Sequence, residues 1–481
     1  GGGVYLVKHN YYATIIQCNF TGNMAFFRGG GGINVEIDHL FLIVSRCVFF
    51  ENRADTVSGG GMYLSSDNND VSITDCLFLK NYAHLNGGGL YIATVNWNMR
   101  LENIEFLENT VGPSAFGGGI YIGLYCDFMI ITHCTFTDNL AKNGGGIYIN
   151  TGIIDIRMIA NTFLRNYASS DGGGIFIGTA LSLVTLSACS FTENVAPGRG
   201  GGIYVGDLNN DLTMISCNFT KNVGTIYGGG IYVGIDNDYL TIKACIFVSN
   251  IAPDGGGGGF LALSDNDDIT LTSCIFENNT ATTGGGVYIV SDNKFMLLTS
   301  CIFIGNKVTS LGGGMLIGIV SDFITFSSCT FRENTARHGG GVYLTSNAAY
   351  VEFISTSFVG NSAHKDGGGL YTSNDNEYMS LASCLFDANS ADGYGGGLYI
   401  SSDHNNMLVQ SCNFRYNFAS LHGGGMHVGS DNLEMSLLYL TFEDNTAGKD
   451  GGALSLMFDN LHFSVRYSTF HRNLADESGK P

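Results

Sequence analysis

Hydrophobic and polar residues alternate in short runs along the whole chain. Residues 269–272 (Ile-Thr-Leu-Thr) alternate with a period of two, and apolar-Tyr-apolar triplets recur, as at residues 120–122 (Ile-Tyr-Ile). A period of two places alternate side chains on opposite faces of a β-strand, and the 3.6-residue period of an amphipathic helix is absent. Three glycines precede most of these triplets, and glycine is a poor helix former. The pattern predicts a chain of short β-strands.

One motif, Phe-x-x-Asn, divides the chain into repeats. It occurs 17 times, and successive phenylalanines are 27 to 30 residues apart. Two or three short strands separated by turns, repeated at this interval, are typical of one coil of a parallel β-solenoid. We therefore predict an all-β fold, a single parallel β-helix of about 17 coils of ~28 residues, with residues 1–481 forming one continuous domain. The chain opens on Gly1 inside a repeat, so we expect a segment of a longer protein.

Stacked coils explain why the same residue types recur at each position. Equivalent side chains lie above one another, so the phenylalanines form an interior column of rings and the asparagines form a ladder of amides that bond along the column. Glycine allows a backbone conformation or a close approach that a Cβ would prevent. Representative positions of the two columns are Phe20, Asn23, Phe78, Asn81, Phe219, Asn222, Phe331, Asn334, Phe470 and Asn473.

Twelve of the 13 cysteines lie two residues before the repeated phenylalanine. This shared position, with parallel side-chain vectors, favours free buried thiols over disulfides, although bridges between neighbouring coils stay an alternative. No Cys-x-x-Cys pair suggests a metal site. Cys126 lies off this column, and we single it out as a candidate reactive or intermolecular thiol. Representative cysteines of the column are Cys18, Cys47, Cys76, Cys245 and Cys412.

Composition and charge narrow the possible functions. The chain has 69 glycines, 44% hydrophobic residues and a net charge of −20. The hydrophobic fraction can form a large core, which argues against disorder. Nucleic-acid binding requires a basic surface, so we expect no nucleic-acid partner for this acidic chain. The negative net charge also disfavours binding to anionic membranes. No apolar run approaches the ~18 residues of a membrane-spanning helix, and we expect no membrane insertion.

The tyrosine of the apolar-Tyr-apolar triplet is the first candidate for a binding surface. If its apolar neighbours point inward, the tyrosines point outward and form an aromatic stripe. Such a stripe could stack on sugar rings or pack against a neighbouring protein. The alternative is a cross-strand ladder that stabilises the sheet. The candidate stripe comprises Tyr63, Tyr91, Tyr121, Tyr148, Tyr204, Tyr232, Tyr371 and Tyr399.

A recurring aspartate lies eight residues after the first glycine of the triplet in several repeats. Asp-Asn favours turns through side-chain to backbone hydrogen bonds, and this is the preferred interpretation. The alternative is Ca²⁺ bound between stacked carboxylates. The calcium candidates are the aspartates of four consecutive repeats, Asp375, Asp403, Asp431 and Asp459. We expect no other cofactor.

Catalytic residues are not evident in the sequence. Polysaccharide cleavage on a solenoid requires clustered carboxylates, or acids that hold a metal beside a basic residue, at a local break in regularity. The basic residues here are scattered singly. We expect no enzyme activity, and the alternative is a polysaccharide lyase or hydrolase.

Residues Phe331-Arg332-Glu333-Asn334, followed by Gly339-Gly340-Gly341-Val342, resemble the polymorphic outer membrane protein repeats of chlamydiae. The chain is also similar to the wider group of right-handed β-helix repeat proteins, which includes pectate-lyase-like domains and surface proteins. The resemblance covers essentially the whole chain and implies a right-handed, three-sided helix at the cell surface or outside the cell. One departure is the third glycine of the triplet, where the chlamydial repeats favour alanine, and no catalytic residue carries over.

These inferences predict an extracellular or cell-surface structural and adhesive rod, such as a stalk, an adhesin shaft or a filament subunit. The expected partners are further copies of the chain or other surface and matrix proteins, with glycans as an additional candidate. The alternative is a carbohydrate-binding or polysaccharide-degrading, pectate-lyase-like β-helix that uses the tyrosine face.

Overall fold

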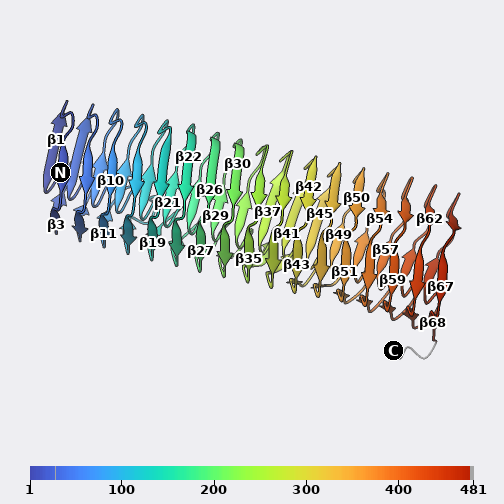
Figure 1. Cartoon of the computed structure of the whole chain (residues 1–481). Coiled ribbons are helices and arrows are strands. Elements are labelled where there is room, and N and C mark those ends of the chain that lie inside the picture. The colour runs from blue at the N-terminus through green and yellow to red at the C-terminus, as the bar shows by residue number, and fades with distance from the viewer. Residues whose placement is uncertain (28, 477–481) are drawn as a thin grey trace. The chain divides into compact units, whose positions relative to one another are not determined.

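The computed structural model of the protein describes residues 1–27 and 29–476. The chain forms two compact units, Gly1–Thr241 and Ile242–Pro481, and each is described by itself. The described residues form 68 strands and no helix, which confirms the all-β prediction. In each unit the strands of successive coils lie side by side (Figure 1). One continuous domain over residues 1–481 stays a prediction. None of the described residues forms a helical segment that could cross a bilayer.

Each coil contains four strands, and the strands repeat 17 times along the described chain, at about 28 residues per coil. In the first unit, one coil comprises β9 (Met62–Leu64), β10 (Ser72–Thr74), β11 (Leu77–Leu79) and β12 (Tyr82–Ala83). In the second unit, a coil comprises β49 (Val342–Leu344), β50 (Val351–Ile354), β51 (Ser357–Val359) and β52 (Ser362–Ala363). The sequence predicted two or three strands per coil. The additional strand is the two-residue segment that follows the asparagine of the Phe-x-x-Asn motif. Two residues are too few to show a period of two.

Equivalent strands of successive coils pair in parallel and in register. β9 pairs with β13 (Leu90–Ile92), which sets Tyr63 opposite Tyr91, and β11 pairs with β15 (Glu105–Leu107), which sets Phe78 opposite Phe106. In β9 the two apolar residues are buried and the central tyrosine is half-buried. The register is specific because a one-residue slip would turn the buried set toward solvent.

The repeated phenylalanines form an aromatic column inside each unit, except that Phe470 of the last coil stacks on Phe442 but is 49% exposed. In the first unit, the ring centroids of Phe49 and Phe78 are 4.4 Å apart and those of Phe78 and Phe106 are 4.9 Å apart, with nearly parallel planes. In the second unit, Phe303 and Phe331 are separated by 4.5 Å. Aromatic pairs at these distances add about 0.5–1.5 kcal/mol each beyond the burial of their area.

The ladder asparagines are hydrogen-bonded from coil to coil and are buried, apart from the half-buried Asn23 and Asn473 of the first and last coils. The side-chain amide of Asn81 donates to Oδ1 of Asn109 at 2.9 Å and to the Phe49 carbonyl at 2.8 Å, and its main-chain N–H also donates to Oδ1 of Asn109, at 3.1 Å. The same three bonds recur from coil to coil in both units, for example from Asn334. The ladder thus satisfies polar groups at a turn that the sheets leave open.

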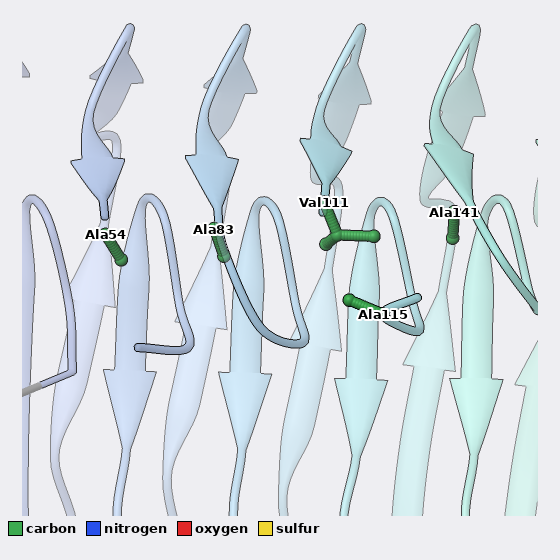
Figure 2. Close-up of a cluster of buried hydrophobic side chains, with 5 residues drawn as sticks. All are labelled: Ala54, Ala83, Val111, Ala115 and Ala141. Atoms are coloured by element: carbon green, nitrogen blue, oxygen red, sulfur yellow. The ribbon is translucent and has the colours of Figure 1, made fainter. Parts of the chain in front are cut away.

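Small side chains fill the corner beside the short fourth strands. Ala54, Ala83, Val111 and Ala141 lie at the ends of β8 (Arg53–Ala54), β12, β16 (Thr110–Val111) and β20 (Leu140–Ala141), and Ala115 joins them from the turn after β16 (Figure 2). Val57 packs against this cluster from the turn after β8. The cluster anchors the turns that lead to the glycine triplets.

All thirteen cysteines are thiols, with no disulfide among residues 1–27 and 29–476. Those of the predicted column point inward, and Cys18 alone is half-buried while the others are buried. The thiol of Cys76 donates to the Thr74 carbonyl at 3.1 Å, and burial raises its pKa to about 12. These thiols therefore act as small interior groups.

Candidate ligand-binding site

The predicted tyrosine stripe is a stacked column on the strands that follow the glycine triplets. Ring centroids are 4.9 Å apart between Tyr63 and Tyr91 and between Tyr91 and Tyr121, and 5.3 Å apart between Tyr121 and Tyr148. In the first unit Phe176 continues the column to Tyr204 and Tyr232. In the second unit, Tyr343, Tyr371 and Tyr399 stack in the same way.

The stripe points outward but is partly covered, since five of its eight tyrosines are half-buried and three are buried, and its role in binding stays a prediction. Tyr121, Tyr204 and Tyr232 are only 8%, 9% and 2% exposed, and burial raises the pKa of Tyr121 to about 12. Each ring also covers the face of its neighbour. A sugar ring cannot stack on a face that another tyrosine already occupies, so only ring edges and the ends of the column are available.

In several coils the side chain immediately before the glycine triplet covers the tyrosine column, and we call this place the covering position. Phe116 stacks on Tyr148 with centroids 4.8 Å apart. The guanidinium of Arg199 lies 4.9 Å from the Tyr204 centroid and 5.0 Å from the Tyr232 centroid. Sequence reasoning missed this position because its residue type changes in nearly every coil.

Arg199 is held over the two tyrosines by a carboxylate. Its Nε donates to Oδ1 of Asp171 at 3.1 Å, and Asp171 occupies the covering position one coil earlier. A second, mixed group lies over the column in the other unit, where the Tyr394 ring stacks on His422 and approaches His427. In both places side chains of the chain itself close over the column.

Small residues occupy the covering positions next to Tyr63 and before Tyr91. The covering positions there are Gly29 and Ser58, and a Cβ built on Gly29 would overlap the Tyr63 ring. A cavity of about 440 Å³ opens at this place. It is lined by Phe27, Gly29, Glu36, Val57, Ser58, Tyr63, Ser65, Leu85 and Tyr91.

Polar groups of the cavity are arranged around Glu36, its charged residue. The amide of Asn34 donates to Oε1 of Glu36 at 3.3 Å, and Asn34 takes the place of a tyrosine in β5 (Ile33–Ile37), between Tyr5 and Tyr63. Oδ1 of Asn34 is buried without a hydrogen-bond partner. Burial raises the pKa of Tyr63, and the nearby Glu36 charge adds to this, while a hydrogen bond with Ser65 opposes it. Tyr63 therefore stays protonated at neutral pH.

The four aspartates proposed as calcium ligands lie in turns. Asp375, Asp403, Asp431 and Asp459 are exposed and have φ angles of 58°, 62°, 61° and 57°. Aspartate tolerates this left-handed backbone better than most residues. Among residues 1–27 and 29–476, no three His, Cys, Asp or Glu side chains gather in a way that could hold a metal ion. Calcium binding stays a prediction.

The residues after these aspartates form a second asparagine ladder that sequence reasoning missed. The amide of Asn209 donates to Oδ1 of Asn237 at 3.0 Å, and that of Asn432 donates to Oδ1 of Asn460 at 2.9 Å. Several coils replace the asparagine, for example with His404, whose Nε2 lies 2.8 Å from the Thr372 hydroxyl. The frequent Asp-Asn pairs were the available signal, and the substitutions hid the column.

Cys126 occupies the same second ladder. It is completely buried, its thiol donates to the Ala93 carbonyl at 2.8 Å, and burial raises its pKa to about 12. The expectation of a reactive or intermolecular thiol is therefore wrong. Cys126 lies off the cysteine column because it takes the place of an asparagine in the second ladder. Asn96, a member of that ladder, donates to the same Ala93 carbonyl.

A second aromatic column lies on the turns of the other unit and was not predicted. Phe295, Phe323, Tyr350 and Tyr378 stack with centroids 4.9–5.1 Å apart. These four side chains are 51%, 43%, 47% and 45% exposed. Each has a positive φ angle in the turn that follows the second ladder. This column, which we call the exposed aromatic column, is a genuine aromatic stripe on the surface.

The architecture defines a parallel β-helix with an interior of repeated ladders. The model of the family described as "right-handed β-helix region" matches residues 2–175, 159–299 and 264–447 of the chain. The chain belongs to this family, which confirms the predicted handedness. A Chlamydia polymorphic membrane protein repeat matches residues 439–456. A comparison with curated proteins gives no match.

Several solved structures are similar to the chain at low identity. Tailspike protein 3 of bacteriophage CBA120 is 8% identical, with 87% of this chain and 56% of the tailspike covered, and a TM-score of 0.43. The A-module of the Azotobacter vinelandii mannuronan C-5 epimerase AlgE6 is 10% identical, with 90% of each chain covered and a TM-score of 0.31. PfbA, a surface adhesin of Streptococcus pneumoniae, is 10% identical, with 78% and 84% covered and a TM-score of 0.31. The chain thus spans little more than half the length of the tailspike.

Proposed function

We propose that the chain is a noncatalytic structural and adhesive β-helix located at the cell surface or outside the cell. The observation that carries this proposal is the exposed aromatic column. Four large aromatic side chains remain accessible at fixed spacing on a scaffold whose interior is already filled by ladders. Contiguous exposed apolar groups are typical of protein interaction surfaces.

Two further features support an adhesive scaffold. Residue type differs from coil to coil in the turns and at the covering position, while the phenylalanine and asparagine columns of the interior repeat the same residue types. Functional contacts concentrate on such variable segments when a rigid scaffold presents them. The local match to a Chlamydia polymorphic membrane protein repeat supports a surface location.

A bead attachment assay tests the adhesive role. Beads coated with residues 1–481 are incubated with a panel of bacterial and eukaryotic cells and with immobilised matrix proteins. We expect saturable attachment to at least one surface, reduced by at least about fivefold when Phe295, Phe323, Tyr350 and Tyr378 are replaced by asparagine, because large aromatic groups dominate interface energies. Asparagine occupies the same turn position, with positive φ, at Asn98 and Asn406, so the substitution preserves the backbone.

The matched control is Tyr416→Asn, which removes an aromatic side chain that is 56% exposed in a different turn. Attachment that the fourfold variant leaves unchanged, or that Tyr416→Asn abolishes equally, contradicts the proposed surface. A separate incubation with acidic and neutral polysaccharides measures new reducing ends and unsaturated products. Release of either by the purified chain contradicts the noncatalytic role and favours the polysaccharide-degrading alternative.

A further inference from the structure

A groove opens in the second unit at the point where the exposed aromatic column ends. The last member of the column is Tyr378, and the next three coils place Asn406, Glu434 and His462 at the same turn position. Their φ angles of 54°, 56° and 55° are close to the 51° of Tyr378. The main-chain N–H of Tyr378 donates to the Asn405 carbonyl at 2.9 Å, so these turns continue the track of the column. Polar side chains therefore replace the column's large aromatic rings on the same backbone.

The groove has a volume of about 640 Å³ and lies on the outer face of one sheet. It spans β58 (Leu408–Gln410), β62 (Ser436–Leu438) and β66 (Ser464–Arg466), whose in-register pairing sets the first residues of the three strands side by side. All of its lining residues belong to the second unit and are described by the structure. They are Asn406, Met407, Leu408, Glu434, Ser436, His462, Phe463, Ser464 and Arg466.

Two of these side chains bring opposite charges to the groove. Glu434 stands in a turn of one coil, and Arg466 ends the strand β66 of the next coil. Both side chains are exposed, and no ion pair within 4.0 Å joins one to the other. Arg415 of the same unit, by contrast, pairs with Asp387 at 2.9 Å. Within residues 1–27 and 29–476, neither Glu434 nor Arg466 has such a partner, so the two charges are presented to an external ligand.

Neutral hydrogen-bonding groups share the groove with the two charges. The Ser464 hydroxyl donates to Oγ of Ser436 at 3.5 Å, a long contact that leaves both hydroxyls able to bond more strongly to a ligand. The Asn406 side chain adds an amide, which both donates and accepts, and Leu408 adds a half-buried apolar surface. A neutral sugar would leave both charges without a counterion, whereas a ligand with one cation and one anion pairs with both. The groove therefore favours a zwitterionic ligand.

We propose that this groove binds a peptide segment that carries one basic and one acidic side chain. The basic group pairs with Glu434, the acidic group pairs with Arg466, and the hydroxyls of Ser436 and Ser464 bond to the peptide main chain. Side chains two residues apart in an extended peptide lie on one face, about 7 Å from each other, so a Lys-x-Glu segment presents both charges to the groove. This inference is independent of the proposed adhesive role, because no member of the exposed aromatic column lines the groove.

The test is a ligand-detected NMR titration of the whole chain with the peptide acetyl-Lys-Ala-Glu-amide. The comparison peptides, acetyl-Gln-Ala-Glu-amide and acetyl-Lys-Ala-Gln-amide, each lack one charge and keep the same length. We expect saturable binding of the doubly charged peptide and about two- to fivefold weaker binding of each comparison peptide, which is the effect that one exposed ion pair gives. Equal binding of the three peptides, no binding of any of them, or tighter binding of neutral maltotriose overturns the proposal.

Two variants assign each charge of the peptide to its partner. Glu434→Gln should weaken binding of the doubly charged peptide and leave that of acetyl-Gln-Ala-Glu-amide unchanged, because the latter has no cation to lose its partner. Arg466→Gln should likewise leave the binding of acetyl-Lys-Ala-Gln-amide unchanged. Glu352→Gln is the matched control, since it removes an exposed glutamate of β50, in the same sheet but outside the groove. Unchanged affinity in both groove variants, or an equal loss in the control, with native circular dichroism spectra, overturns the proposal.

Discussion

The Oδ1 atom of Asn361 accepts two hydrogen bonds from Asn334, one from its main-chain nitrogen at 3.1 Å and one from its side-chain amide at 3.0 Å. The same amide also donates to the Phe303 carbonyl at 3.0 Å. One side chain therefore connects its own coil with the coil before it and the coil after it.

Replacement of Asn334 by alanine removes this connection. The main-chain carbonyl of Phe303 would lose a donor, and the main-chain N–H and side-chain amide of Asn306 would lose their acceptor, Oδ1 of Asn334, and an unsatisfied buried polar group costs about 1–3 kcal/mol. We expect the free energy of unfolding, measured with urea, to fall by about 3 kcal/mol. The control Asn413→Ala affects an exposed asparagine on a strand and should change it by less than about 0.5 kcal/mol. Equal effects of the two substitutions would contradict the role of the ladder.

The third glycine of the triplet faces the phenylalanine column. A Cβ on Gly314 would lie 2.7 Å from the Gly341 carbonyl oxygen and 2.9 Å from Cδ1 of Phe331. We expect Gly314→Ala to reduce stability by about 1–3 kcal/mol through overpacking. Gly360→Ala is the comparison, because Gly360 has a φ of 62° but only Glu333 Cγ nearby, at 3.7 Å, and its cost should be backbone strain of about 1 kcal/mol. A larger loss at Gly360 than at Gly314 would refute the packing argument.

His404 makes stability depend on pH. Burial lowers its pKa from 6.5 to about 4, so the folded chain keeps it neutral where the unfolded chain takes up a proton. The unfolded state then binds more protons below pH 6.5, and stability falls as the pH is lowered from 6.5 to 4, by about 3 kcal/mol in total. Urea unfolding of the unmodified chain and of His404→Asn, the residue found at this ladder position in other coils, measures the effect. The variant should show a shallower decline with pH, and an identical decline would exclude His404 as its source.

The cysteines should differ sharply in their reactivity. Cys18 is half-buried, whereas Cys126 and Cys134 are at most 1% exposed with pKa values raised to about 12 by burial. The thiolate is the reactive form, so we expect a maleimide at pH 8 to modify Cys18 first and the other thiols only after unfolding. Mass spectrometry of peptides after timed labelling measures this. Early modification of Cys126 in the folded chain would contradict its placement on the second ladder.

The coil and its two principal columns were predictable because Phe-x-x-Asn keeps the same residue types at the same spacing. Phe78 and Asn81 could be placed inside the fold from this spacing alone. The second ladder escaped detection because His404 and Cys126 interrupt its asparagines. The covering position could not be predicted, because Phe116 and Arg199 occupy equivalent places in their coils but have different chemistry. That the Tyr121 side chain points outward was predictable. Its burial was not, because it depends on a turn elsewhere in the coil.

Differences in coil length are absorbed in the turns. Phe106 and Phe136 are 30 residues apart and Phe136 and Phe163 only 27, yet the rings stack at 4.9 and 4.8 Å. An in-frame duplication of one entire repeat would therefore place each duplicated residue beside neighbours of the same types as in the original repeat. Genes for such chains can lengthen or shorten by whole repeats, and acquire new residues at covering positions, without the compensating mutations that a globular core would require.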